Sequence, residues 1–327
     1  MVKAMKKARI LVVGSCVMDL IVRARRFVNP GETILGEDFT TASGGKGANQ
    51  AVQAALLGAQ VDMLGKVGND DFGRRMLASL KEHGVNISHV MVTDESSSAI
   101  GNIQIQENEQ GTQNRIVVIP AANMLIRPEE VAFLKEDIKN YDMVMLQHEI
   151  PLHINELVAA YAHAADVPVM LNPAPTAAIS DEHLANLTYI SPNEHEGADL
   201  VGFSIVTEED CRRAIEALLR RGVKNVMITR GSEGAVLGNA EGLTFSPCVK
   251  VEHVADPTAA GDSFVAAFCT ATCVGIKHQD AMLFAAHAAS ITVSRMGAQP
   301  SLPSLAEVFD YMQLKGVDMA RFAALKA

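Results

Sequence analysis

The sequence lacks the features that mark secreted, membrane and disulfide-stabilised proteins. Its five cysteines are an odd number scattered over 327 residues, which fits reduced thiols better than a disulfide framework. There is no tryptophan, no His-Glu-x-x-His pattern, and no apolar run near the roughly 18 residues that a membrane span needs. We therefore expect a soluble, cytoplasmic protein without a membrane partner.

An excess of positive charge is also missing. The 38 acidic residues outnumber the 28 basic ones, so the formal net charge is −10. A protein that binds nucleic acid would show a basic face or a high isoelectric point, and a nucleic acid is therefore not expected as a partner. Because 48% of the residues are apolar, a chain of this length can bury a core without disulfide or metal support.

Short apolar runs alternate along the chain with longer segments of helical periodicity. The runs are residues 10–13, 143–146, 167–171 and 226–229, and the helical segments are 48–57, 72–83 and 208–221. Each helical segment is followed by a glycine, the residue that favours a left-handed helix end. Strands that are apolar throughout are covered on both faces. The alternation therefore predicts a three-layer α/β/α domain with a mostly parallel central sheet.

Two segments interrupt this alternation of strands and helices. Residues 20–42 and 88–119 contain strand-like patches with no helix between them, and apolar and polar side chains alternate at 103–106. We assign these segments to a small sheet with one exposed face, able to cover a site or to pair with another subunit. Residues 1–19, 43–87 and 120–327 are then the main domain. Ligands of open parallel sheets bind beyond the carboxyl ends of the strands, where we expect the site.

A glycine-rich turn, Ser-Gly-Gly-Lys-Gly-Ala-Asn at residues 43–49, precedes the first helical segment. Its glycines allow close approach of the backbone to a ligand, and a helix N-terminus favours an anionic or oxygen-rich partner. It is not a Walker A loop, because Gly47 follows Lys46 where that loop has Ser or Thr. A simple tight turn before a helix is the alternative.

Small residues also precede the helical segment that begins near Asp262. Unobstructed N–H groups at such a helix start can hold a phosphoryl group, and Asp262 can act as a general base toward a hydroxyl. Taken alone, a capping aspartate is the favoured interpretation. Asn193 and Glu196, three residues apart, could reach magnesium or phosphate, but taken alone a solvated acidic first turn is the favoured interpretation.

These motifs occur together, in order, with a Gly-Ala-Gln-Pro-Ser segment at residues 297–301. The combination resembles the ribokinase branch of the PfkB carbohydrate kinase family over almost the whole chain. The resemblance implies a ribokinase-like fold in which the two interrupting segments form a β-lid. It also implies transfer of the ATP γ-phosphoryl group to the primary hydroxyl of a pentose, with D-ribose giving ribose 5-phosphate. It further implies Mg²⁺ and a monovalent cation, K⁺, as cofactors, and a homodimer formed through the lid.

The resemblance also implies residue roles. Asp262 matches the family's catalytic base, and the backbone around Ala259, Ala260 and Gly261 matches its anion hole. The positions that match its sugar site are Asp19, Val17, Gly45, Lys46, Asn49 and Glu149. Those that match its nucleotide site are Asn193, Thr229, Gly231, Ser232 and Gly234, with Glu196 linked to Mg²⁺. Those that match its monovalent-cation site are Asp256, Thr258, Thr292, Arg295, Gly297 and Ser301.

Two departures from the family pattern bear on substrate and cation. Val17 stands where ribokinases commonly have an asparagine that reaches the sugar, which favours an acceptor lacking a hydroxyl, such as deoxyribose. Pro257 replaces the usual threonine beside Asp256 and stiffens that turn. His287 is a candidate for stacking on adenine, although a core histidine is an equal alternative.

Other functions remain open on the sequence. A deoxyribokinase or nucleoside kinase is the alternative within the family, and a non-catalytic sugar-binding regulator is the alternative outside it. Retention of Asp262 counts against the regulator, because a binding protein needs no base. A nicotinamide dehydrogenase is disfavoured, because no Gly-x-Gly-x-x-Gly follows the first strand.

Overall fold

The computed structural model describes residues 7–108 and 111–326. The strands are β1 Arg9–Val13, β2 Val17–Ala24, β3 Asp38–Gly44, β4 Gln60–Gly68, β5 Asn86–Thr93, β6 Ala99–Asn108, β7 Gly111–Ile119, β8 Met143–Gln147, β9 Val169–Asn172, β10 Tyr189–Ile190, β11 Asn225–Thr229, β12 Ala235–Asn239 and β13 Gly242–Ser246. The α-helices are α1 Lys46–Leu56, α2 Asp71–Glu82, α3 Pro128–Val131, α4 Leu134–Asp137, α5 Leu152–Ala164, α6 Asp181–Ala185, α7 Glu194–Val201, α8 Glu208–Arg220, α9 Ala260–Cys273, α10 His278–Val293 and α11 Leu305–Leu314. The 3-10 helices are η1 Ala121–Leu125, η2 Ile138–Asn140, η3 Gly231–Glu233, η4 Gln299–Ser301 and η5 Met319–Lys326.

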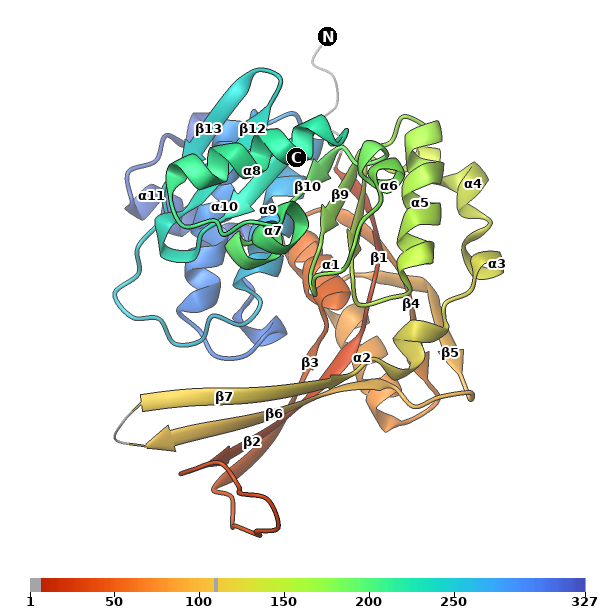
Figure 1. The fold of residues 1–327 in the computed structure, drawn as a ribbon, viewed down its shortest axis with the longest axis vertical. Helices are drawn as coiled ribbons and strands as arrows, with labels where there is room; N and C mark the ends of the chain where they lie inside the picture. The colour runs from red at the N-terminus through yellow and green to blue at the C-terminus, as the bar shows by residue number, and fades with distance from the viewer. Residues whose placement is uncertain (1–6, 109–110, 327) are drawn as a thin grey trace.

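The described strands form two sheets. The larger has nine strands in the order β13-β12-β11-β10-β9-β8-β1-β4-β5, and the smaller has four in the order β3-β2-β6-β7. In the large sheet every pairing from β11 to β5 is parallel, and only β12 and β13 run antiparallel to their neighbours. The predicted mostly parallel sheet between helical layers is therefore confirmed (Figure 1).

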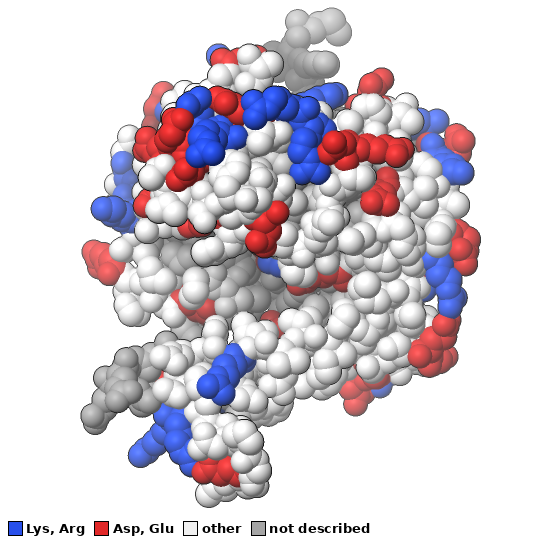
Figure 2. Space-filling view, viewed as in Figure 1, with Lys and Arg blue, Asp and Glu red and all other residues white. Residues whose placement is uncertain are grey.

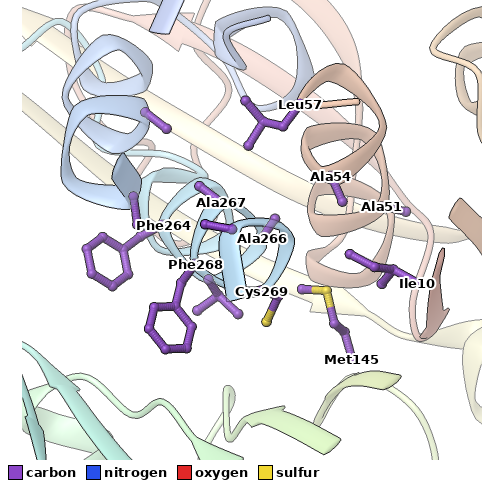
Figure 3. Packing of buried hydrophobic residues seen from close by; sticks show 14 of the residues in the cluster. Ile10, Ala51, Ala54, Leu57, Met145, Phe264, Ala266, Ala267, Phe268 and Cys269 are labelled. Carbon is purple, nitrogen blue, oxygen red and sulfur yellow. The ribbon is translucent and has the colours of Figure 1, made fainter. Parts of the chain in front are cut away.

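Two hydrophobic cores lie against the large sheet, one on each face. Ile10 and Val12 of β1 lie in one cluster with residues of α1, α9 and α10, whereas Leu11 and Val13 lie in another with residues of α5 and α8. This alternation explains why β1 is apolar throughout. Figure 3 shows α1 and α9 packed together through alanines of both helices. Their small side chains let the two helix N-termini lie close to each other.

The predicted helix ends are also confirmed. Helices α1, α2 and α8 end within one or two residues of the expected positions. Gly58, Gly84 and Gly222 follow them with φ of +96°, +79° and +110°. Glycine adopts these positive φ angles without a steric penalty, which explains why a glycine follows each of the three helical segments in the sequence.

The small sheet projects from the main body, and β2 follows β1 after only three residues (Figure 1). The residues that form the small sheet differ from the segments expected for the lid, 20–42 and 88–119. Residues 88–93 belong to β5, which pairs with β4 in the large sheet, whereas residues 17–19 and 43–44 lie in the small sheet. Residues 1–6, 109–110 and 327 of the expected domains lie outside the described residues. In the described part of the chain, no helix has the length and apolar character needed to cross a bilayer.

Candidate active site

The glycine-rich turn and the loop after β1 meet at the carboxyl end of the large sheet. Here the surface is hollowed between the main body and the projecting sheet (Figure 2). Gly45 has φ of +92°, and a Cβ atom on Gly47 would lie 2.5 Å from the backbone nitrogen of Ser15. The close approach that these glycines permit is therefore partly to the chain's own backbone. It joins the start of α1 to the β1–β2 connection.

Asp262 lies in the first turn of α9 and is 5% exposed. Its Oδ2 accepts a hydrogen bond from Asn49 Nδ2 at 3.0 Å, and its Oδ1 accepts one from Gln50 Nε2 at 3.1 Å. Asn49 Oδ1 is buried and has no partner among the described residues, which leaves an acceptor beside the carboxylate for a ligand hydroxyl. The interpretation of Asp262 as a mere helix cap does not account for these two long-range amide bonds.

Two further carboxylates lie on the sugar side expected from the sequence. Glu149 Oε2 accepts hydrogen bonds from Ser15 Oγ and from the backbone nitrogen of Lys46, the latter at 2.9 Å. Burial, and then repulsion from Glu149, raise the pKa of Asp19 to about 7. Cβ atoms on Gly44 and Gly101 would lie 2.6 and 2.5 Å from the oxygens of Asp19. The small sheet therefore holds this carboxylate between two glycines.

Lys46 supplies positive charge between the acidic groups. Burial opposes its charging, but the fields of Asp262, Glu149 and Glu196 outweigh burial and raise its pKa. An ammonium group surrounded in this way stays protonated at neutral pH. It can neutralise part of the negative charge that three carboxylates and an incoming phosphate would otherwise concentrate here.

Asn193 and Glu196 form a capping box at the start of α7. Asn193 Oδ1 accepts from the backbone nitrogens of His195 and Glu196, and Glu196 Oε2 accepts from the Asn193 nitrogen at 2.9 Å. The first turn of α7 is therefore capped as well as acidic, and Glu196 in it is partly buried rather than fully solvated. Burial raises the pKa of Glu196, with Asp262 adding to the rise and Lys46 opposing it. The Glu196 carboxylate is therefore electrostatically coupled to the residues around Asp262.

A cavity of about 680 Å³ lies beside the start of α9. It is lined by five residues expected at a nucleotide site, Asn193, Thr229, Gly231, Ser232 and Gly234, and by Pro257, Ala260 and Gly261. Sequence reasoning missed its apolar wall, formed by Val249, Val251 and Val254 from the loop after β13 and by Phe264, Ala286, Ala289 and Val293 from α9 and α10. The small residues spaced along one face of α10 are the signal that could have revealed part of this wall. His287 lies elsewhere: it is 2% exposed, bonds the Leu283 carbonyl and packs against Tyr311.

The expected anion hole combines an open space with a strained backbone. Ala259, at the N-cap of α9, has φ of +61°, which costs an alanine about 1–2 kcal/mol. The Ala260 nitrogen donates to the Pro257 carbonyl at 3.2 Å, so this expected donor is engaged within the turn. A Cβ atom on Gly261 would meet no atom within 4 Å. Space for a ligand therefore exists directly over the first turn of the helix.

The residues expected at the cation site come together through the backbone. Asp256 accepts from Thr258, through its backbone nitrogen and hydroxyl, and from the Gly297 nitrogen at 3.0 Å. The guanidinium of Arg295 pairs with Glu307. The remaining two side chains have partners inside the protein: Thr292 Oγ1 bonds Ser263 and the Ala288 carbonyl, and Ser301 Oγ bonds the Ala298 carbonyl. The segments adjoin, but their side chains are engaged with other protein groups, so a cation here would depend on carbonyl oxygens.

Comparisons with known proteins identify the family and the fold. Residues 7–305 match the model of the pfkB family carbohydrate kinases. The chain is 39% identical to a ribokinase of Bacillus subtilis over 299 residues, which cover 91% of this chain and 97% of that one. It is 32% identical to a deoxyribokinase of Salmonella typhi over 306 residues, covering 93% and 99%. A solved Arabidopsis thaliana ribokinase, complexed with ribose and ATP, superposes with a TM-score of 0.87 at 32% identity, covering 94% of this chain and 99% of that one.

Proposed function

Because this chain belongs to the PfkB family of carbohydrate kinases, we propose that it transfers the γ-phosphoryl group of ATP to the primary hydroxyl of D-ribose, forming ribose 5-phosphate. One observation carries the proposal. Asp262 is buried directly after Gly261, which lines the 680 Å³ cavity suited to a nucleotide, and its field reaches Lys46 together with that of Glu149, one of the carboxylates suited to a sugar. A relative that binds both ribose and ATP has the same fold.

The sugar side offers complementary hydrogen-bonding groups. Asp19 and Glu149 can accept from vicinal hydroxyls, while Asn49 Oδ1 is a buried acceptor without a partner among the described residues. Leaving such a group unpaired is costly, and a sugar hydroxyl would satisfy it. We assign Asp19, Asn49 and Glu149, together with the turn at Gly45 and Lys46, to sugar binding.

Asp262 then acts as the general base. Its Oδ2, beside Asn49, accepts the proton of the primary hydroxyl as the hydroxyl oxygen bonds to the γ-phosphorus. The bond from that phosphorus to the bridging oxygen breaks, and ADP leaves with the electron pair. Lys46 and the backbone over Gly261 stabilise the charge on the transferring group. The chemistry requires positioning and charge more than a nucleophilic side chain.

The residues present suit a magnesium ion. Glu196 offers a carboxylate that is coupled to Lys46 and Asp262, and Mg²⁺ prefers oxygen ligands and few protein groups. In the described part of the chain, no three His, Cys, Asp or Glu side chains form a metal cluster, which suits an ion held largely by the nucleotide's phosphates and water. Glu196 would hold the ion, which supplies charge neutralisation when bound.

The loops at Asp256 and Gly297 offer a monovalent cation no free carboxylate of the kind that Glu196 offers Mg²⁺. We propose that K⁺ is held there by carbonyl oxygens of residues 256–258 and 292–301. The hydrogen bond from Gly297 to Asp256 ties this site to the turn that precedes the anion hole. A cation that orders these loops would thereby order Ala259 to Gly261. The activity is then expected to be higher in KCl than in NaCl.

Deoxyribose is the second candidate acceptor, and Val17 is the observation that favours it. Val17 is 5% exposed and adjoins Gly45 and Gly101, next to Asp19. An apolar side chain at this position offers no hydrogen bond to a sugar hydroxyl and discriminates weakly against its absence. The similarity to a deoxyribokinase supports the same alternative.

We further propose that the small sheet acts as a lid over the sugar and joins two copies of the chain. On β7, at its edge, Ile116, Val117, Val118 and Ile119 are 50–62% exposed, although side chains alternate between the faces of a strand. An exposed edge strand that is apolar on both faces promotes aggregation of a monomer, and a second copy of the chain would cover it. We expect a homodimer by analytical ultracentrifugation, dissociated by Val117→Glu. The free cysteines support a reducing, cytoplasmic location.

Release of ADP over a panel of acceptors tests the function. Ribose, 2-deoxyribose, fructose and nucleosides are compared with Mg²⁺ and K⁺ present, in the wild type and in Asp262→Asn. We expect turnover with ribose and loss of more than about 99% of it in the variant, given the usual 10²–10⁴-fold contribution of a general base. Sugar binding without ADP release for any acceptor would instead identify a non-catalytic binding protein.

A further inference from the structure

Gln50, the residue after Asn49 in α1, binds the carboxylate that the proposed function uses as its base. It is fully buried, and its Nε2 lies 3.1 Å from Asp262 Oδ1. Asn49 donates to the other oxygen, Oδ2, and the proposed function places the sugar on that side, where Asn49 Oδ1 is a buried acceptor without a partner among the described residues. Gln50 therefore holds the oxygen that is remote from the substrate.

A second buried amide determines how Gln50 is oriented. Gln147, at the end of β8, donates from Nε2 to Gln50 Oε1 at 2.7 Å. Gln50 Nε2 also donates to Asn172 Oδ1, at the end of β9, at 3.3 Å. If the Gln50 amide were flipped by 180°, its oxygen would face two other acceptors, Asp262 Oδ1 and Asn172 Oδ1. Its NH₂ group would face the NH₂ group of Gln147. Only one orientation is therefore satisfied, and it directs the NH₂ group at Asp262.

From these contacts we infer that Gln50 is a positioning residue for the catalytic base. It fixes the rotation of the Asp262 carboxylate about its Cβ–Cγ bond, so that Oδ2 is presented to the acceptor hydroxyl. A neutral amide suits this task, because it orients the carboxylate without adding a positive charge beside the base. The inference rests on the proposed role of Asp262 and adds a residue that contacts neither sugar nor nucleotide.

The same helix contains a matched control. Gln53 is also fully buried, one turn from Gln50, and it bonds the Pro303 carbonyl and the Ser263 hydroxyl. Like Gln50, it is hydrogen-bonded to a side chain of α9, but its partner there is Ser263 and not Asp262. Gln50→Met and Gln53→Met therefore remove the same amide from equivalent surroundings. Only the first releases the carboxylate.

Steady-state kinetics with ribose and ATP compare the two variants. We expect kcat of Gln50→Met to fall by about 10–100-fold, the effect of a misplaced catalytic group, with KM for both substrates within about threefold of the wild type. In Gln53→Met, kcat should stay within about threefold. Equal losses of kcat in both variants would overturn the inference, because they would indicate a general effect on packing.

Two further measurements separate positioning from structure. In the Asp262→Asn background, Gln50→Met should cause no additional loss of residual kcat, because Gln50 acts through that carboxylate; additive losses would contradict this. Gln50→Glu places a second carboxylate against Oδ1. Because the pair would then share a proton, we expect the acid limb of the kcat profile to move at least about one pH unit upward. An unmoved profile counts against the inference.

The outcomes distinguish this inference from the proposed function. If Asp262→Asn retains full activity, Asp262 is not the base and the proposed mechanism fails. If Asp262→Asn is inactive while Gln50→Met turns over like Gln53→Met, the mechanism stands and only the role of Gln50 is refuted.

Discussion

Asp19→Asn is expected to make the unliganded protein more stable while disabling sugar binding. In the folded state the pKa of Asp19 is raised to about 7 from an ordinary 3.8, by burial first and by Glu149 second. A raised pKa means that the folded state favours the protonated acid. This stabilisation is complete below pH 3.8 and is lost as pH rises through 7. At pH 8 the wild type therefore carries a charge that destabilises its fold.

The magnitude follows from the shift. A difference of about three pKa units, at about 1.4 kcal/mol each, corresponds to roughly 4 kcal/mol of unfolding free energy at pH 8. Between pH 8 and pH 6 the wild type recovers about 1.4 kcal/mol of this penalty, because the folded protein takes up close to one proton. Asparagine has the same shape without the charge and should not show that recovery.

Urea unfolding of the apoprotein at pH 6 and pH 8 tests the reasoning. The stability advantage of Asp19→Asn over the wild type should be about 1.4 kcal/mol larger at pH 8 than at pH 6. Asp38→Asn, at an exposed position of β3 in the same sheet, is the control and should show no such pH dependence. The reasoning is refuted if the advantage of Asp19→Asn is the same at both pH values, or if the variant is less stable than the wild type at pH 8.

Three further predictions concern other parts of the structure. Gly261→Ala should fold normally, since its Cβ meets open space, but kcat should fall by about 10² because the methyl group would fill the space that the proposed function gives to the phosphoryl group. Ala121 has φ of +42°, so Ala121→Gly should raise the free energy of unfolding by about 1 kcal/mol, measured in urea. Lys66 is 3% exposed and paired with Glu130, so Glu130→Ala should destabilise the protein by about 3–5 kcal/mol in the same assay. Glu130→Ala in a Lys66→Met background should cost much less.

Local features of the fold could be predicted because each is encoded within a few residues. Apolar runs specified four of the nine strands of the large sheet, β1, β8, β9 and β11, and Gly58, Gly84 and Gly222 marked helix ends. The place of β5 could not be predicted, because the alternation of its side chains is compatible with either sheet. Pairing with β4 places β5 in the large sheet, and this pairing depends on the register of the whole chain.

The candidate site was predictable where its chemistry lies in a contiguous motif, as at Asp262 and Lys46. The contacts of Gln50 and Ser15 could not be predicted because their partners are distant in sequence: Gln50 and Asp262 are 212 positions apart, and Ser15 and Glu149 are 134 apart. A buried glutamine within an alanine-rich helix gives no sign of what it contacts. The apolar wall of the cavity was missed for a related reason, since valines of the loop at residues 249–254 resemble ordinary loop or strand residues until the fold brings them beside α10.

The direct passage of the chain from β1 into β2 has a consequence for substrate selection. Asp19 belongs to the projecting sheet, whereas Glu149 and Asp262 belong to the main body, and Ser15 lies on the short segment that joins the two. Under the proposed function, a sugar that engages all three carboxylates ties the two bodies together. Contacts far from the reacting hydroxyl then contribute to alignment at the phosphorus, so a sugar lacking a remote hydroxyl should lose turnover as well as affinity. A water molecule, too small to span both bodies, would not obtain that alignment, which guards ATP against futile hydrolysis.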